Sequence, residues 1–143
     1  MQKSTKEIEN ELSHATTFQE LKEMIDKNEI EKQSFGAKLL ELCEKYEVKA
    51  PELQKNVAIS KSQFYAVLNG TRKPSRILII KISLVLGIML EEINYLLKLA
   101  GYKELYAKNK EDAIIKFGIE HKKSIYEINE VLKEYNYNLL DEE

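Results

Sequence analysis

Apolar residues recur at helical spacing through most of the chain, and this periodicity limits the fold more than any other feature of the sequence. One helix face is formed by five residues at offsets of 0, 4, 7, 8 and 11: Phe35, Leu39, Leu42, Cys43 and Tyr46. Five glycines and two prolines among 143 residues leave few interruptions, and no stretch alternates as a strand would. The sequence therefore predicts an all-α fold.

Capping residues indicate where the helices begin. Ser, Thr and Asn side chains accept hydrogen bonds from the free amides of a first helical turn, and Pro is tolerated there. The expected caps are Thr17, Ser34, Ser60, Ser75, Asn109 and Ser124, with Pro51 in a first turn. With these caps, the expected helices cover about residues 6–14, 17–26, 34–46, 51–57, 60–69, 75–86, 89–100, 109–120 and 124–135.

Several apolar residues of these helices are expected to face a core. They include Phe18, Leu21, Met24 and Ile25 in the second helix, Ile114 and Phe117 in the eighth, and Ile125, Ile128, Leu132 and Tyr135 in the last. Residues 77–90 form the most apolar run, which Lys81 and Ser83 interrupt. This run is shorter than the roughly 20 residues that span a bilayer, so it is interpreted as a buried helix.

Residues that commonly carry catalysis or bind metals are few and scattered. Cys43 is the single cysteine, which excludes an intramolecular disulfide and fits a reducing cytosol, and it is interpreted as a core residue. His14 and His121 lie more than a hundred residues apart. Because no zinc spacing, glycine-rich phosphate loop or nucleophile-base pair is present, we expect no enzyme, no metal and no cofactor. The N-terminus lacks the apolar core of a signal peptide, so we expect a cytoplasmic protein without a membrane partner.

Charge is unevenly distributed along the chain. The formal net charge is −2, yet residues 49–82 carry seven cations against the single acid Glu52, a local charge of +6. The cations are Lys49, Lys55, Lys61, Arg72, Lys73, Arg76 and Lys81. The flanking residues, 1–48 and 83–143, each carry −4. Because a local cluster of cations can attract an anionic partner whatever the total charge, residues 49–82 are the candidate contact with nucleic acid.

Within this basic stretch, residues 50–70 have the pattern of a short helix, a tight turn at Ala58 and Ile59, and a second helix capped by Ser60. A helix fits the major groove of DNA, where its outward first turns reach base edges. The residues expected to read bases are Lys61, Ser62, Gln63, Tyr65 and Ala66. Basic and hydroxyl residues expected along the DNA backbone are Lys49, Ser60, Thr71, Arg72, Lys73 and Arg76.

Residues 35–100 also resemble the five-helix helix-turn-helix domain of the phage-repressor-like, XRE-type family of bacterial transcriptional regulators. Three segments carry the resemblance: Pro51-Glu52-Leu53, Ile59-Ser60-Lys61-Ser62 and the run from Phe64 to Ser75, which ends in Asn-Gly-Thr-Arg-Lys-Pro-Ser. The resemblance implies base-facing positions at Lys61, Ser62, Tyr65 and Ala66. It implies backbone contacts at Asn69, Thr71, Arg72 and Lys73.

Three positions depart from the pattern of that family. Members often have Gln where this chain has Ala50, Ala where it has Gln54, and Gly where it has Ala58. Ala50 cannot make the phosphate contact of the glutamine. Gln54 is expected to push the two helices apart unless its stem lies along the surface, and Ala58 must avoid a positive φ or be strained by it.

Residues 96–115 resemble the C-terminal helical extension of a subgroup of these regulators in Gram-positive bacteria. The matching runs are 96–102, 105–110 and 112–115. The expected organisation is an N-terminal helical extension at 1–33, a helix-turn-helix DNA-binding domain at 34–101 and a C-terminal helical extension at 102–143. The resemblance is compatible with an adaptor role in signalling.

Two functions fit these observations. The first is a sequence-specific DNA-binding transcriptional regulator whose helix Ser60–Asn69 enters the major groove of double-stranded DNA. Because one such helix reads only a few base pairs, we expect a homodimer on a palindromic site. The alternative is the same fold used as a protein-interaction adaptor or inhibitor. The acidic flanks, the alanine at position 50 and the many tyrosines favour this second function.

Overall fold

The computed structural model describes residues 5–28 and 33–140, and the chain divides into two compact units, 1–32 and 33–143. Every regular element in the described residues is an α-helix, which confirms the expected all-α class. No helix among them is both long and apolar enough to cross a membrane.

The first unit is a pair of helices, α1 (Thr5–Leu12) and α2 (Phe18–Asn28). Thr17 caps α2 as expected, since its Oγ1 accepts a hydrogen bond from the Glu20 amide at 3.1 Å. The Glu20 carboxylate in turn accepts a hydrogen bond from the backbone amide just before the cap, at 2.9 Å. Local capping chemistry therefore fixes where α2 begins.

Burial in the first unit differs from the prediction at one residue. Phe18, expected to face a core, is 81% exposed. A helical side chain leans over the turn that precedes it, and Phe18 is the first residue of α2 with no such turn to cover. Leu21 and Met24 are half-buried, and the side chain of Ile25 lies outside the described residues.

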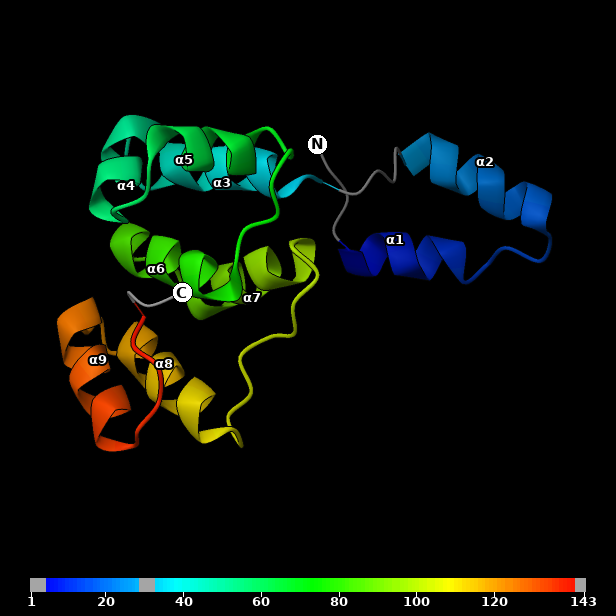
Figure 1. Ribbon diagram of the computed structural model, residues 1–143. Helices are drawn as coiled ribbons and strands as arrows, with labels where there is room; N and C mark the ends of the chain where they lie inside the picture. Colours follow the sequence, from blue (N-terminus) through cyan, green and yellow to red (C-terminus); the bar gives the residue numbers. More distant parts are fainter. Residues whose placement is uncertain (1–4, 29–32, 141–143) are drawn as a thin grey trace. The chain divides into compact units, whose positions relative to one another are not determined.

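The second unit holds the remaining helices of the described chain. They are α3 (Phe35–Lys45), α4 (Ala50–Asn56), α5 (Lys61–Leu68), α6 (Arg76–Leu86), α7 (Leu90–Leu99), α8 (Lys110–Glu120) and α9 (Ile125–Glu134). Figure 1 shows three layers in this unit: α3, α4 and α5 form the first, α6 and α7 the middle, and α8 and α9 the third. The boundary expected after residue 101 falls inside this unit.

The expected N-caps of the second unit are all present. The side-chain oxygens of Ser34, Ser60, Ser75, Asn109 and Ser124 each accept a hydrogen bond from an amide in the following first turn, at 3.0 to 3.1 Å. Pro51 lies in the first turn of α4, where its missing amide hydrogen costs nothing. These local signals explain why the helix starts agree with the sequence analysis.

The core of the second unit is built around α6, as the apolar run predicted. Ile79, Ile80 and Ile82 are each at most 1% exposed, and Lys81 and Ser83 of the same helix are also buried. The Ser83 hydroxyl is satisfied because it donates to the Ile79 carbonyl oxygen at 2.7 Å. Core residues from the other layers are Leu39, Leu42, Leu53, Phe64, Ile93, Leu96, Leu97, Ile115 and Leu132.

Two aromatic residues of the third layer do not face the core. Phe117 is 56% exposed and Tyr135 is 53% exposed. Helix α8 meets its neighbours through Ile115, Gly118 and Ile119, so Phe117 falls to one side of the packed stripe. Tyr135 ends α9 as its C-cap, outside the helical repeat that predicted its burial.

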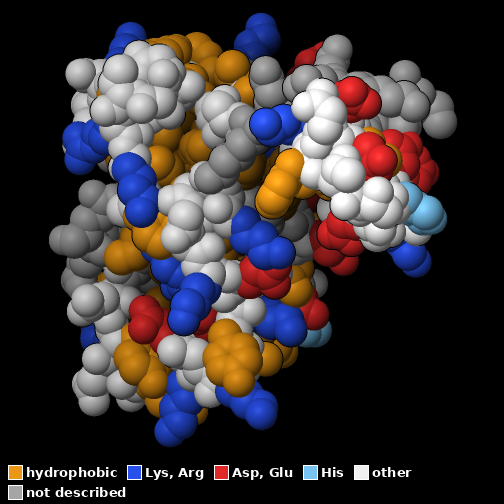
Figure 2. All heavy atoms as spheres, turned by 90° about the vertical axis from the view of Figure 1, so that its right-hand side faces the viewer, with side chains coloured by type: hydrophobic (Ala, Val, Ile, Leu, Met, Phe, Trp, Pro, Cys, Tyr) orange, Lys and Arg blue, Asp and Glu red, His pale blue; other side chains and the backbone are white. Residues whose placement is uncertain are grey.

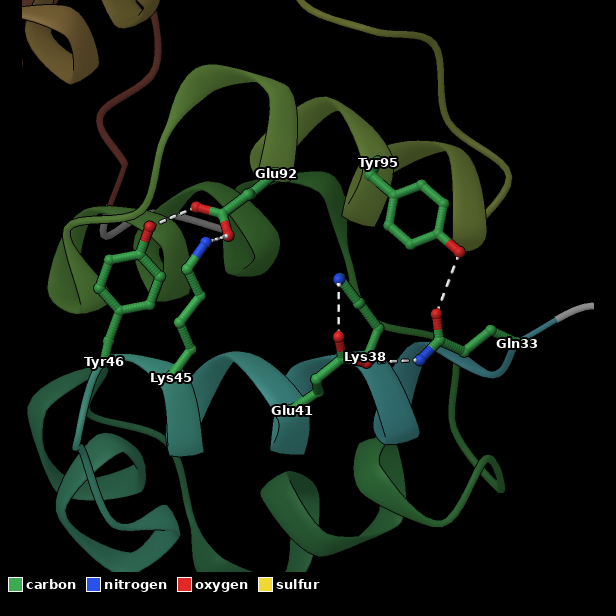
Figure 3. Close-up of polar contacts among 7 residues, drawn as sticks. All are labelled: Gln33, Lys38, Glu41, Lys45, Tyr46, Glu92 and Tyr95. Carbon is green, nitrogen blue, oxygen red and sulfur yellow. Dashed lines mark hydrogen bonds and ion pairs between the residues drawn. The ribbon is translucent and has the colours of Figure 1, made fainter. Parts of the chain in front are cut away.

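A polar network joins α3 to α7 along one edge of the unit (Figure 3). At one end of this edge, Lys45 Nζ lies 2.8 Å from Glu92, and the Tyr46 hydroxyl donates to the same carboxylate. At the other end, the Tyr95 hydroxyl donates to Gln33 at 3.0 Å. Burial alone would raise the pKa of Glu92, but the hydrogen bonds from Lys45 and Tyr46 hold this pKa below its usual value.

This network predicts a specific loss of stability in acid. A carboxylate whose pKa is lowered in the folded state stabilises the protein above its unfolded pKa, near 4.3, and loses this contribution as the pH falls through the folded pKa. Glu92→Gln should therefore be less stable than the parent protein at pH 7. The gap in free energy of unfolding, measured by urea titration, should narrow toward roughly pH 3. Glu91→Gln, at the exposed neighbouring position, is the control and should follow the parent protein at both pH values.

Candidate nucleic-acid interface

The turn between α4 and α5 sets the direction of α5, the helix expected to read bases. Its central residue, Ala58, has a φ of 58°, in the left-handed region that alanine rarely adopts. Gln54 is 8% exposed, and its side-chain amide donates to the carbonyl oxygen of Ile59 in the turn. The Gln54 stem is therefore buried, not laid along the surface, and its amide links α4 to the turn.

Helix α5 has one buried face and one exposed face. Phe64 and Val67 are at most 2% exposed and hold the helix against the core. Among the expected base-reading residues, Lys61, Ser62 and Tyr65 are exposed, whereas Gln63 and Ala66 are half-buried. The Ser60 oxygen is occupied as the cap that accepts from the Gln63 amide. The helix thus presents a polar first turn to solvent.

The loop after α5 is shaped by its own hydrogen bonds. The Asn69 side-chain oxygen accepts from the Thr71 amide at 3.0 Å and from the Thr71 hydroxyl at 2.7 Å. The Ala66 carbonyl accepts from the amides of Thr71 and Arg72 at 3.0 and 3.1 Å, and Gly70 takes a φ of 83°. Asn69 and Thr71 therefore bond to each other, while the side chains of Arg72 and Lys73 are exposed.

Two of the seven cations of the basic stretch do not contribute to the exposed positive charge, because one is paired with a carboxylate and the other is buried. A single nitrogen of Arg76, Nη2, donates to both oxygens of the buried Asp112 carboxylate, at 2.9 and 3.0 Å, so the charge of Arg76 is balanced within the protein. Lys81 is only 8% exposed, within α6. The exposed cations that remain are Lys49, Lys55, Lys61, Arg72 and Lys73.

These cations flank α5 at both of its ends. Lys61 is the first residue of α5, and Arg72 and Lys73 follow its last residue, Leu68. The loop folds back along α5, because Arg72 and Lys73 line one hollow together with Gln63 of its first turn. On the face that Figure 2 shows, Lys and Arg side chains occur at several separate places.

Two residues that the sequence did not single out, Tyr102 and Asp112, contact this site. Tyr102 donates its hydroxyl hydrogen to the Pro74 carbonyl at 2.8 Å, and Lys73 Nζ lies 4.4 Å from the Tyr102 ring centroid. Asp112, besides pairing with Arg76, accepts from the Tyr106 amide at 2.9 Å. A signal for Asp112 was present in the sequence: an acid directly before an apolar run, in a helix expected to pack on the core.

The third layer carries a second exposed surface. A groove of about 440 Å³ runs between α8 and α9, lined mainly by apolar side chains that include Ile114, Phe117, Ile128 and Val131. Gly118 allows α8 and α9 to approach closely, because a Cβ there would lie 2.4 Å from the Ile128 Cδ1 atom.

No group of three potential metal ligands occurs in the part of the chain that the structure describes.

No protein-family model, curated protein or solved structure matches the chain. The relationship to the phage-repressor-like family therefore stays a prediction carried by the motif residues of α4, α5 and the loop that follows them.

The strained turn predicts an unusual response to glycine. Ala58→Gly removes the cost of holding an alanine at positive φ, which exceeds the cost of the added backbone freedom, so we expect about 0.5 kcal/mol of added stability in urea unfolding. Ala37→Gly, at an exposed helical position in α3, is the matched control and should cost about 0.5 kcal/mol. Equal destabilisation by both changes would contradict a strained turn at Ala58.

Proposed function

We propose that the chain is a sequence-specific DNA-binding transcriptional regulator of the phage-repressor-like class, with α4 and α5 as its helix-turn-helix. The observation that carries this proposal is the construction of α5. Buried Phe64 and Val67 anchor one face of the helix, and the opposite face is exposed and polar in its first turn. The exposed cations Arg72 and Lys73 directly follow its end, where a DNA backbone would pass.

Specific recognition by such a helix needs a second copy. One α5 contacts only a few base pairs, so two chains on a palindrome, with half-sites about 34 Å apart, supply the missing specificity. We therefore propose that the protein binds DNA as a homodimer. Helix α5 lies in the layer opposite α8 and α9 (Figure 1), so the groove of the third layer stays open when α5 meets DNA.

The first test is a titration of affinity against salt. A duplex selected from random sequences should bind with a steep negative slope of log affinity against log salt. The double change Arg72→Glu and Lys73→Glu removes two phosphate contacts and adds repulsion, so it should lower affinity roughly 100-fold and reduce the slope by about 2. The control pair, Lys122→Glu with Lys133→Glu, makes the same change in net charge at exposed positions between α8 and α9 and in α9, and it should bind nearly as the parent protein does. A flat slope for the parent protein would remove the proposal.

The second test separates base reading from backbone contact. Lys61→Gln should change the preferred base at one position of the selected site, because a lysine at a base edge carries about 1 to 3 kcal/mol of discrimination. Arg72→Gln should weaken all sequences about equally and leave the preference intact. Repeating the selection with each variant measures both effects. The same preferred sequence for Lys61→Gln and the parent protein would show that α5 does not read bases through Lys61.

A protein-interaction adaptor is the second candidate, and the groove between α8 and α9 favours it. Phe117 is 56% exposed and Val131 is 38% exposed along this groove. Exposed apolar grooves between helices are typical sites for an amphipathic partner helix. Both functions are compatible in one chain, since the groove and α5 lie in different layers. The salt titration decides whether DNA binding is one of them.

A further inference from the structure

The loop between α5 and α6 borders two hollows of the surface. A hollow of about 230 Å³ lies on one side of it, lined by residues that include Gln63, Leu78 and Tyr102. A second hollow of about 240 Å³, lined by residues that include Phe35 and Leu99, lies on the other side. Arg72, Lys73 and Pro74 line both hollows. The position of these cations therefore depends on a few specific contacts.

Tyr102 supplies the contacts that hold the second half of the loop. Its hydroxyl donates to the Pro74 carbonyl at 2.8 Å, and its ring lies under the Lys73 ammonium group at 4.4 Å. The first half of the loop is held from α5, through the Ala66 carbonyl. Tyr102 belongs to a different segment, so the loop is fixed from two sides.

Tyr102 is itself firmly placed. Its amide donates to the Leu97 carbonyl of α7 at 2.8 Å, and Gly101 before it takes a φ of 87° to turn the chain. Further along the segment, Asp112 of α8 holds Arg76 at the start of α6. Residues 102–112 therefore bond to the chain on both sides of Ser75, the N-cap of α6: Tyr102 to Pro74 before it and Asp112 to Arg76 after it.

We infer that Tyr102 is a positioning residue that holds Lys73 for a DNA phosphate, with residues 102–112 acting as a brace for the basic loop; this inference rests on the proposed function. A cation over an aromatic ring keeps its charge and can still bind a phosphate, whereas Arg76 is neutralised by Asp112. A lysine that is already ordered also loses less freedom when it binds. Arg76 is then a structural residue, and Arg72 and Lys73 are the backbone contacts of this loop.

The test is a double-mutant cycle between Tyr102 and Lys73, measured on the selected duplex. Tyr102→Leu should weaken binding about threefold to tenfold and lower the salt slope by up to about 1, and Tyr102→Phe should have a smaller effect. In a Lys73→Met background, Tyr102→Leu should have no further effect, because the side chain that it positions is gone. Tyr126→Leu is the matched control, since the Tyr126 side chain lies in α9, outside residues 102–112, and is 72% exposed; it should leave affinity unchanged.

Amide hydrogen exchange tests the brace without DNA. The amide of Leu78, which donates to the Ser75 cap between the two braced positions, should exchange faster in Tyr102→Leu than in the parent protein, with α3 amides unchanged as evidence that the fold is intact. Unchanged exchange would overturn the brace. Unchanged affinity in Tyr102→Leu, or an equal loss in the Lys73→Met background, would overturn the positioning role while leaving the proposed function in place. Failure of the parent protein to bind any duplex would remove the proposed function and the phosphate role of Lys73 together. Amide hydrogen exchange, which needs no DNA, would still show whether Tyr102 braces the loop.

Discussion

The burial of α6 is the constraint on which the second unit depends. This helix lies in the middle layer and contacts α4 and α7, and its residues Ile79, Ile80 and Ile82 are almost completely removed from water. Burying an aliphatic side chain of this size contributes about 1.5 to 3 kcal/mol, so α6 supplies much of the drive to assemble the unit. Helices α4 and α7 pack directly on α6, and α5 follows α4 through the turn at Ala58.

A helix buried in this way has a consequence at its N-terminus, where the chain must leave the core and become the basic loop. Ser75 caps the helix, and the next residue, Arg76, is a cation at the edge of an apolar layer. Leaving such a charge partly buried and unpaired would be costly, and Asp112 from α8 balances it through two hydrogen bonds. The C-terminal segment is thereby tied to the same point of the chain that carries Arg72 and Lys73.

The features predicted correctly from sequence are those set by local chemistry. Caps at Ser34, Ser60 and Ser75 depend on hydrogen bonds within one helical turn, and a few residues of sequence contain all of that information. The exposure of Phe117 and the burial of Lys81 depend on which neighbours each helix meets, which periodicity does not encode. The role of Arg76 could not be predicted for a related reason. Its partner lies 36 residues away in a helix whose placement the sequence did not specify.

Fewer charges of residues 49–82 face solvent in the structure than the sequence alone suggests. The sequence assigns +6 to residues 49–82, but pairing of Arg76 and burial of Lys81 leave five exposed cations against the exposed Glu52. In the proposed complex with DNA, each phosphate contact releases counterions and adds to the salt slope. Few such contacts per chain would therefore give a modest affinity for DNA. When the phosphate contacts are few, the arrangement of the cations affects binding more than their number does. In the proposed DNA complex, Lys73 held over Tyr102 and the neighbouring exposed Arg72 would give the loop a defined register on the DNA backbone, and two such loops in a dimer would double the contacts without any further basic residue.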